Sequence, residues 1–207
     1  MTIILRHHPF SRAANVVWML EEVGVPYELR YVDFAAGEHK ADEHRGLNAM
    51  GKLPVLIDDD AVISESAAIG VYLADRYSSG DLAPALDDPA RGPYLRWCFY
   101  GPSVVEPCCM AHASKWEYRA ASAGFGTYES LLDTLERGIG DGPWLLGDRF
   151  TMADVVLGGT VRFMLQFKML EARPRFTEYA ERLSARPAAV AAAAVNARVI
   201  QERGLGA

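Results

Sequence analysis

The sequence predicts two parts: an α/β domain over residues 1–80 and an all-helical domain over residues 89–207, joined by a linker at 81–88. In the first part, short apolar strands alternate with amphipathic helices. From Ser78 to Pro89 the chain becomes rich in polar residues, glycine and proline, which is typical of a linker. After that stretch every periodic segment has the apolar spacing of a helix.

The first three elements are a strand, a helix and a second strand. Ile3–Leu5 form a short buried strand, and from Ser11 apolar residues recur at helical spacing as far as Gly24. Glycine is common just past the end of a helix because it adopts the left-handed conformation without strain. Tyr27–Val32 is rich in strand-forming residues. We expect a short helix within the polar stretch 37–46.

A β-hairpin and a helix complete the α/β part. Two apolar strands, 55–57 and 61–63, flank the acidic turn 58–60, and a helix runs from about Glu65 to Tyr77. A proline stands directly before the first of these strands. Proline cannot donate to a β-ladder, so it is tolerated at the start of a strand or where a cis bond turns the chain.

The second part has only helical patterns. An amphipathic stripe covers 128–139, and further helices are predicted at 176–183 and in the alanine-rich run 188–201. Thr151 and Asp154 have the spacing of a capping box, in which each side chain bonds a backbone N–H at the start of a helix. An apolar helix is therefore predicted to start after Thr151.

Composition and charge exclude several classes of protein. The 207 residues carry a net charge of −6, which is opposite to the basic surface that nucleic-acid binding requires. The three cysteines, Cys98, Cys108 and Cys109, lie near the middle of the chain, and their spacing indicates neither a disulfide framework nor a metal site, so we expect buried free thiols. The apolar run at the start is too short for a signal peptide, and no stretch is long enough for a membrane helix. We expect a reduced, cytoplasmic protein.

Four motifs, in this order, carry a family resemblance. They are Ser11-Arg12 followed by 17–28 (VWMLEEVGVPYE), 47–56 (LNAMGKLPVL), 64–69 (SESAAI) and 144–154 (WLLGDRFTMAD). The chain resembles the glutathione transferase superfamily over nearly its whole length. The resemblance implies a thioredoxin-like domain joined to a helical bundle, a homodimer, and glutathione as co-substrate without a metal ion.

The resemblance also assigns a glutathione site. It implies that the Leu53-Pro54 bond is cis and that the Val55 backbone pairs with the cysteinyl part of glutathione like an added strand. Ser66, at the start of a helix, would bind the γ-glutamyl carboxylate, and Glu65 would face the α-ammonium group. The alternative for Ser66 is an ordinary helix cap.

Basic residues near the proline turn are the candidates for the glycyl carboxylate of glutathione. The resemblance places a basic group there, and the candidates are Lys52, which lies just before the turn, and His39 or Lys40 in the variable segment. The alternative for these side chains is simple exposure to solvent.

The thiol of glutathione needs an activating group, because the thiolate is the nucleophile. The first candidate is the hydroxyl of Ser11, where the first strand meets the first helix, and the second is the charge of Arg12. Depending on the alignment, Phe10 could face the sulfur instead, and it cannot donate to a thiolate. The alternative for Ser11 is again a helix cap.

The predicted activity is transfer of the glutathione thiolate to small hydrophobic electrophiles. Two alternatives stay open. A glutathione-dependent peroxidase or disulfide-bond reductase needs no protein cysteine, and a non-catalytic glutathione-binding protein of the same fold needs no thiolate activator. Because no cysteine precedes Cys98, a mechanism based on a protein thiol in the first domain is excluded.

Overall fold

The structure is a computed structural model that describes residues 3–78 and 80–206. Residues 1, 2, 79 and 207, which fall within the predicted domains, lie outside the described residues. The chain forms two compact units. The first contains residues 3–77 and 187–206, and the second contains residue 78 and 80–186.

A four-stranded mixed sheet forms the centre of the first unit. Its strands are β1 (Ile3–His7), β2 (Tyr27–Tyr31), β3 (Val55–Asp58) and β4 (Ala61–Ser64), in the order β2-β1-β3-β4. β1 runs parallel to β2 and antiparallel to β3, and β3 and β4 form the predicted hairpin. All four predicted strands are confirmed, with ends that differ by one or two residues.

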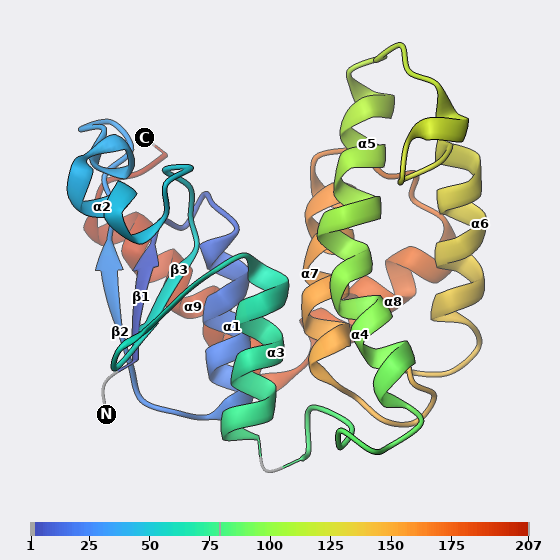
Figure 1. Cartoon of the computed structure of the whole chain (residues 1–207), viewed down its shortest axis with the longest axis horizontal. Helices are drawn as coiled ribbons and strands as arrows, with labels where there is room; N and C mark the ends of the chain where they lie inside the picture. Colours follow the sequence, from blue (N-terminus) through green and yellow to red (C-terminus); the bar gives the residue numbers. More distant parts are fainter. Residues whose placement is uncertain (1–2, 79, 207) are drawn as a thin grey trace. The chain divides into compact units, whose positions relative to one another are not determined.

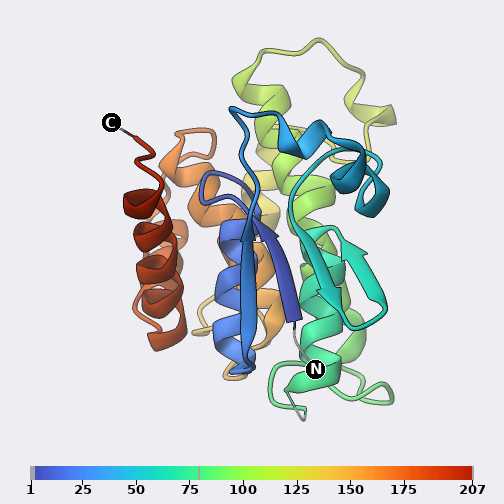
Figure 2. The ribbon, with the colours of Figure 1, turned by 90° about the vertical axis from the view of Figure 1, so that its left-hand side faces the viewer.

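Helices α1 (Ala13–Val23) and α3 (Ser66–Tyr77) pack against each other on one face of this sheet (Figure 2). The predicted start of α1 at Ser11 is two residues early, because Ser11 takes part in the turn before the helix. Gly24 ends α1 in the left-handed conformation, as predicted, with φ of 67°. The polar stretch forms the 3-10 turn η1 (Glu38–Lys40) and α2 (Asp42–Leu47).

The last helix, α9 (Pro187–Glu202), lies beside α1 near the β2 edge of the sheet (Figure 2). Small buried side chains, Ala189 and Ala192, allow this close approach. In the structure, α9 therefore packs as part of the α/β unit. In the sequence, we had placed the same residues in the helical domain 89–207. The boundaries 1–80, 81–88 and 89–207, as divisions of the sequence, stay a prediction.

The second unit is a helical bundle (Figure 1). Its first two helices, α4 (Arg91–Tyr100) and α5 (Glu106–Ala113), continue into one another through a π-helical segment, Gly101–Val105. Pro102 lies in this segment and has no N–H for a helical hydrogen bond. The remaining elements, in chain order, are η3 (Ala120–Ser122), α6 (Tyr128–Ile139), α7 (Met152–Gln166) and α8 (Pro174–Ser184).

The predicted capping box starts α7. The Asp154 carboxylate accepts hydrogen bonds from the backbone N–H groups of Thr151 (3.0 Å) and Leu145 (2.9 Å) and from the hydroxyl of Tyr179 (3.0 Å). The group is fully buried, and these bonds join the loop, α7 and α8. Asp154 is therefore structural, as its spacing from Thr151 predicted.

No helix within the described ranges 3–78 and 80–206 is both long enough and apolar enough to cross a membrane.

Candidate functional site

The predicted binding segments meet at one end of the sheet. The strand register pairs Arg6 of β1 with Val55 of β3, and Val55 with Ser64 of β4. Since β1 is antiparallel to β3, the turn after β1, the proline turn before β3 and the start of α3 after β4 all lie at this end. The end of β2 lies there too, because Tyr31 pairs with His7. The structure therefore brings together segments that are far apart in the sequence.

Ser11 lies in the turn between β1 and α1. Its hydroxyl donates to the backbone carbonyl of His8 (2.8 Å) and accepts from the N–H of Ala13 (3.1 Å). A hydroxyl has one proton, so donation to a sulfur atom would replace the bond to His8. Arg12 is the half-buried residue directly before α1. The bond of Ser11 to Ala13 satisfies the first backbone N–H of α1, which is the capping function that we considered as its alternative role, although the N-cap position itself is held by Arg12.

Aromatic rings surround the His8 side chain. Its ring stacks on Phe34 at 4.1 Å, and its Nδ1 accepts a hydrogen bond from the backbone N–H of Phe10 (3.1 Å). Burial lowers the pKa of His8, although the nearby charge of Asp33 opposes the shift. His8 is therefore a neutral ring that packs, and the exposed Phe10 side chain offers no donor to a thiolate.

The Leu53-Pro54 bond is cis, as the resemblance implied. Two side chains hold the carbonyl of Lys52 just before it: His44 Nε2 at 3.0 Å and Asn48 Nδ2 at 3.1 Å. Leu53, Pro54 and Val55 are buried, whereas Lys52 is exposed. We did not predict that the buried His44 holds the Lys52 carbonyl. In the sequence, His44 is only a polar residue within the stretch predicted to contain a short helix.

Gly51 brings the variable segment against the proline turn. Its φ of +62° lies in the left-handed region, and a Cβ at this position would be 2.8 Å from the carbonyl oxygen of His39. The His39 ring meets Phe34 edge-on at 4.9 Å, and its buried Nδ1 has no hydrogen-bond partner among the described residues. The Lys40 side chain is exposed. His39 thus lies next to the proline turn, as its proposed role requires.

Glu65 connects β4 to α3 in a strained conformation. Its φ of 69° is in the left-handed region, where a residue with a Cβ is disfavoured by about 1–3 kcal/mol. Such strain persists where the surroundings impose it and is concentrated at ligand sites. Ser66 begins α3, a helix of 12 residues whose first N–H groups face the end of the sheet described above.

Cys98, Cys108 and Cys109 are free and buried in the second unit, as predicted. Burial raises the pKa of Cys109 to about 12, so its thiol stays protonated at neutral pH. Burial also raises the pKa of Cys108. These thiols are therefore structural residues.

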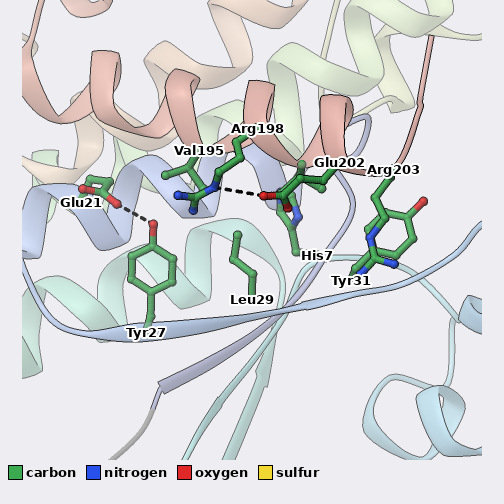
Figure 3. Close-up of a pocket in the computed structure, with 10 residues that line it drawn as sticks. His7, Glu21, Tyr27, Leu29, Tyr31, Val195, Arg198, Glu202 and Arg203 are labelled. Carbon is green, nitrogen blue, oxygen red and sulfur yellow. Dashed lines mark hydrogen bonds and ion pairs between the residues drawn. The ribbon is translucent and has the colours of Figure 1, made fainter. Parts of the chain in front are cut away.

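A crevice of about 380 Å³ lies between α9 and the β2 edge (Figure 3). Its charged groups are mostly paired: the Tyr27 hydroxyl donates to Glu21, and Arg198 lies 4.0 Å from Glu202. The Arg203 guanidinium lies over the Tyr31 ring, 4.6 Å from its centre. These charged groups therefore contact one another or an aromatic ring inside the crevice.

The mixed sheet with a cis-proline before β3 and the following helical unit define a thioredoxin-like domain with a C-terminal helical domain. Family models agree: "Glutathione S-transferase, N-terminal domain" matches residues 1–75, and "Glutathione S-transferase, C-terminal domain" matches residues 118–182. Glutathione S-transferase theta-2 of Homo sapiens is 32% identical over 192 residues, 84% of this chain and 78% of that protein. Glutathione S-transferase APIC of Nicotiana tabacum is 30% identical over 207 residues, 91% of this chain and 95% of that protein. The chain belongs to the glutathione S-transferase family.

Solved structures show the same architecture. A glutathione transferase of Methylococcus capsulatus str. Bath is 28% identical with a TM-score of 0.77, over 94% of this chain and 98% of that chain. A homolog from Sulfitobacter with bound glutathione is 26% identical with a TM-score of 0.73, over 99% of both chains. The transferase URE2P6 of Phanerochaete chrysosporium, in complex with oxidized glutathione, is 25% identical with a TM-score of 0.78, over 95% of this chain and 97% of that chain.

Proposed function

We propose that this protein is a glutathione transferase that conjugates the glutathione thiolate to small hydrophobic electrophiles. The observation that carries the proposal is the meeting of three segments at one end of the sheet: the Ser11 turn, the cis-proline turn and the start of α3. Relatives named as glutathione transferases, including one solved with bound glutathione, support it.

Each part of glutathione has a proposed partner in this region. The backbone of Leu53, Pro54 and Val55 would pair with the cysteinyl part in the manner of an added strand. Ser66 would bind the γ-glutamyl carboxylate through its hydroxyl and N–H, since a helix N-terminus favours anions. The strained Glu65 would face the α-ammonium group.

The glycyl carboxylate would meet a basic group on the neighbouring segments. Lys52 lies directly before the cis-proline turn, and His39 is held against that turn at Gly51. Lys40 is the next residue after His39, and its side chain is exposed, so it is the third candidate for this contact. Carboxylates bind such groups through charge-assisted hydrogen bonds.

Activation of the thiol has a definite energetic requirement. A free thiol has a pKa of about 8.5, and lowering it by about two units requires about 2.7 kcal/mol of preferential stabilisation of the thiolate. A hydroxyl from Ser11 together with the positive charge of Arg12 supplies energy of that order. In this proposal the Ser11 proton turns from the His8 carbonyl to the sulfur when glutathione binds.

Two alternatives are kept because particular observations favour them. The Ser11 hydroxyl already has an acceptor in His8, which favours a glutathione-binding protein without thiolate activation. The complex of URE2P6 with oxidized glutathione favours a peroxidase or disulfide-bond reductase. In that chemistry two glutathione thiols are oxidised to one disulfide while a hydroperoxide is reduced to an alcohol and water, so no protein thiol is needed.

Titration of glutathione into the purified protein, followed by thiolate absorbance against pH, tests the proposal. Binding with a thiol pKa well below about 8.5 supports the transferase. Binding with an unshifted pKa favours one of the two alternatives, and an assay with a hydroperoxide then separates them. Absence of binding would overturn the glutathione assignment.

The family resemblance also leads us to propose a homodimer and a cytoplasmic location. Analytical ultracentrifugation at several protein concentrations tests the first, and a single species with the mass of one chain would contradict it. Fractionation of the source cells tests the second.

A further inference from the structure

Asn196, in the last helix, contacts both ends of the turn that carries Ser11. Its Oδ1 lies 2.8 Å from His7 Nε2, at the last position of β1. Its Nδ2 donates to the carbonyl of Ala14 in the first turn of α1 (3.3 Å) and to the carbonyl of Ala192 in α9 (2.9 Å). One amide group from α9 therefore spans the strand and the helix that the turn connects.

These contacts settle the orientation of both side chains. Carbonyl oxygens can only accept, so the Asn196 atom that faces Ala14 and Ala192 is the amide nitrogen and the atom that faces His7 is the amide oxygen. His7 must then donate from Nε2. Its side chain is fully buried, and burial lowers the pKa of His7, which favours the neutral ring with the proton on Nε2. Figure 3 shows His7 on the sheet side of α9.

Together with the covalent link between His7 and His8, the hydrogen bonds of Asn196 form a closed circuit that passes through Ser11. His7 precedes His8, whose carbonyl accepts from the Ser11 hydroxyl (2.8 Å) and from the Ser11 N–H (3.0 Å). The Ser11 carbonyl accepts from the N–H of Ala14 (3.1 Å), and the Ala14 carbonyl returns to Asn196. A shift of α9 along α1 would therefore strain or break the contacts at both ends of the turn.

We propose that Asn196 is a positioning residue for the Ser11 turn, so that the C-terminal helix sets the alignment of the group that activates glutathione. This inference rests on the proposed function, because it assumes that Ser11 acts on the thiol. A misplacement of about 1 Å at a catalytic group costs up to about a hundredfold in rate, so a single amide that holds the turn has a measurable effect.

The test uses the full-length chain with Asn196→Ala and, as a matched control, Gln201→Ala. Gln201 is an exposed amide in the same helix, so its loss changes α9 without touching the turn. We expect Asn196→Ala to raise the thiol pKa of bound glutathione and to lower kcat/KM for conjugation about tenfold, mainly through kcat. Gln201→Ala should match the wild type.

The partner in the circuit gives a second, independent variant. His7→Leu should reproduce the effect of Asn196→Ala, and the double variant should lose little more than either single variant because both changes break one circuit. His7→Gln keeps an amide donor and should recover part of the activity. If Asn196→Ala fails to fold, the comparison of His7→Leu with His7→Gln tests the inference: recovery of activity in His7→Gln supports it, and equal activity of the two variants contradicts it.

A merely structural role for Asn196 predicts a different result. The variant would then melt at a lower temperature but keep the thiol pKa and the kcat of the wild type below its Tm, and that result would overturn the inference. If the wild type itself binds no glutathione, the proposed function is wrong, and amide hydrogen exchange still tests the positioning. Faster exchange at Ser11 and Ala14 in Asn196→Ala than in Gln201→Ala, without a matching increase in the strands of the sheet, supports it, whereas equal exchange or an increase of the same size throughout the unit contradicts it.

Discussion

Ser11 combines a structural bond with a proposed catalytic one. Its hydroxyl proton points to the His8 carbonyl, and its oxygen accepts from the N–H of Ala13. The two roles use different parts of one group: the oxygen can keep its capping bond while the proton turns to a sulfur. A helix cap and a thiolate donor are therefore compatible in one serine, but only one acceptor can receive the proton at a time.

Replacement of Ser11 separates these roles. Ser11→Ala removes the hydroxyl, so we expect a loss of about 1 kcal/mol in the free energy of unfolding and a rise in the thiol pKa of bound glutathione. Ser11→Thr, which keeps a hydroxyl, is the matched control. Urea unfolding measures the first effect and thiolate absorbance the second. An unchanged thiol pKa in Ser11→Ala would transfer the activating role to Arg12 or exclude activation.

Glu65 provides a second prediction at the residue scale. Glycine adopts a φ of 69° without strain, so Glu65→Gly should raise the free energy of unfolding by about 1 kcal/mol. The same change removes the carboxylate proposed to face the α-ammonium group, so the KM for glutathione should rise. Glu65→Gln keeps the strained backbone and loses only the charge. A KM that rises in neither variant would contradict the binding role of this carboxylate.

Two glycines before the proline turn, Gly46 and Gly51, differ in what an added Cβ would contact. Gly51 has a φ of +62°, and an added Cβ would meet the His39 carbonyl at 2.8 Å. Gly46 lies within α2, where a Cβ would meet nothing within 4 Å. The first glycine is required by the contact between the variable segment and the proline turn, whereas the second is not.

Alanine at each position tests this difference. We expect Gly51→Ala to lower the free energy of unfolding by about 2 kcal/mol and to raise the KM for glutathione, because His39 must move away from the turn. Gly46→Ala should raise the free energy of unfolding by about 0.5–1 kcal/mol, since alanine favours a helix. Chemical denaturation of both variants provides the measurement. Equal effects of the two changes would show that the close approach at Gly51 is not required.

The secondary structure elements could be predicted because their signals are local. Short apolar runs predicted three of the strands, strand-forming residues predicted the fourth, Gly24 marked the end of α1, and the spacing of Thr151 and Asp154 marked the start of α7. The cis bond at Leu53-Pro54 followed from the family resemblance rather than from the residues alone. His44 was missed because its role is a hydrogen bond to the Lys52 carbonyl, which depends on how the loop folds back.

At the scale of the whole molecule, the packing of α9 could not be predicted from its sequence. An alanine-rich helix can pack closely on many partners, and no pattern in residues 188–201 identifies α1 as its packing partner. The contact between His7 and Asn196 joins residues 189 positions apart. Local patterns specify which residues form a helix, whereas such long-range pairing is decided by the folded arrangement as a whole.

The long-range pair also links global stability to pH. His7 is fully buried, and burial lowers the pKa of His7 below its ordinary value near 6.5, with the hydrogen bond to Asn196 opposing part of the shift. The unfolded chain therefore binds a proton at a higher pH than the native protein does. The contribution of the neutral His7 ring to the free energy of unfolding is fully present above about pH 6.5, and it is lost as the pH falls toward the pKa of His7 in the folded state.

We therefore expect the free energy of unfolding to decrease on acidification, by at most about 1.4 kcal/mol per pH unit for one histidine. His8, whose pKa is also lowered by burial, adds to this dependence. Urea denaturation at a series of pH values between about 7.5 and 5.5 measures the slope across the ordinary titration range of histidine. The comparison of wild type with His7→Leu isolates the His7 contribution, because leucine takes up no proton in either state. Equal slopes would mean that His7 binds its proton as readily in the native protein as in the unfolded chain, which is incompatible with a buried neutral ring that donates to Asn196.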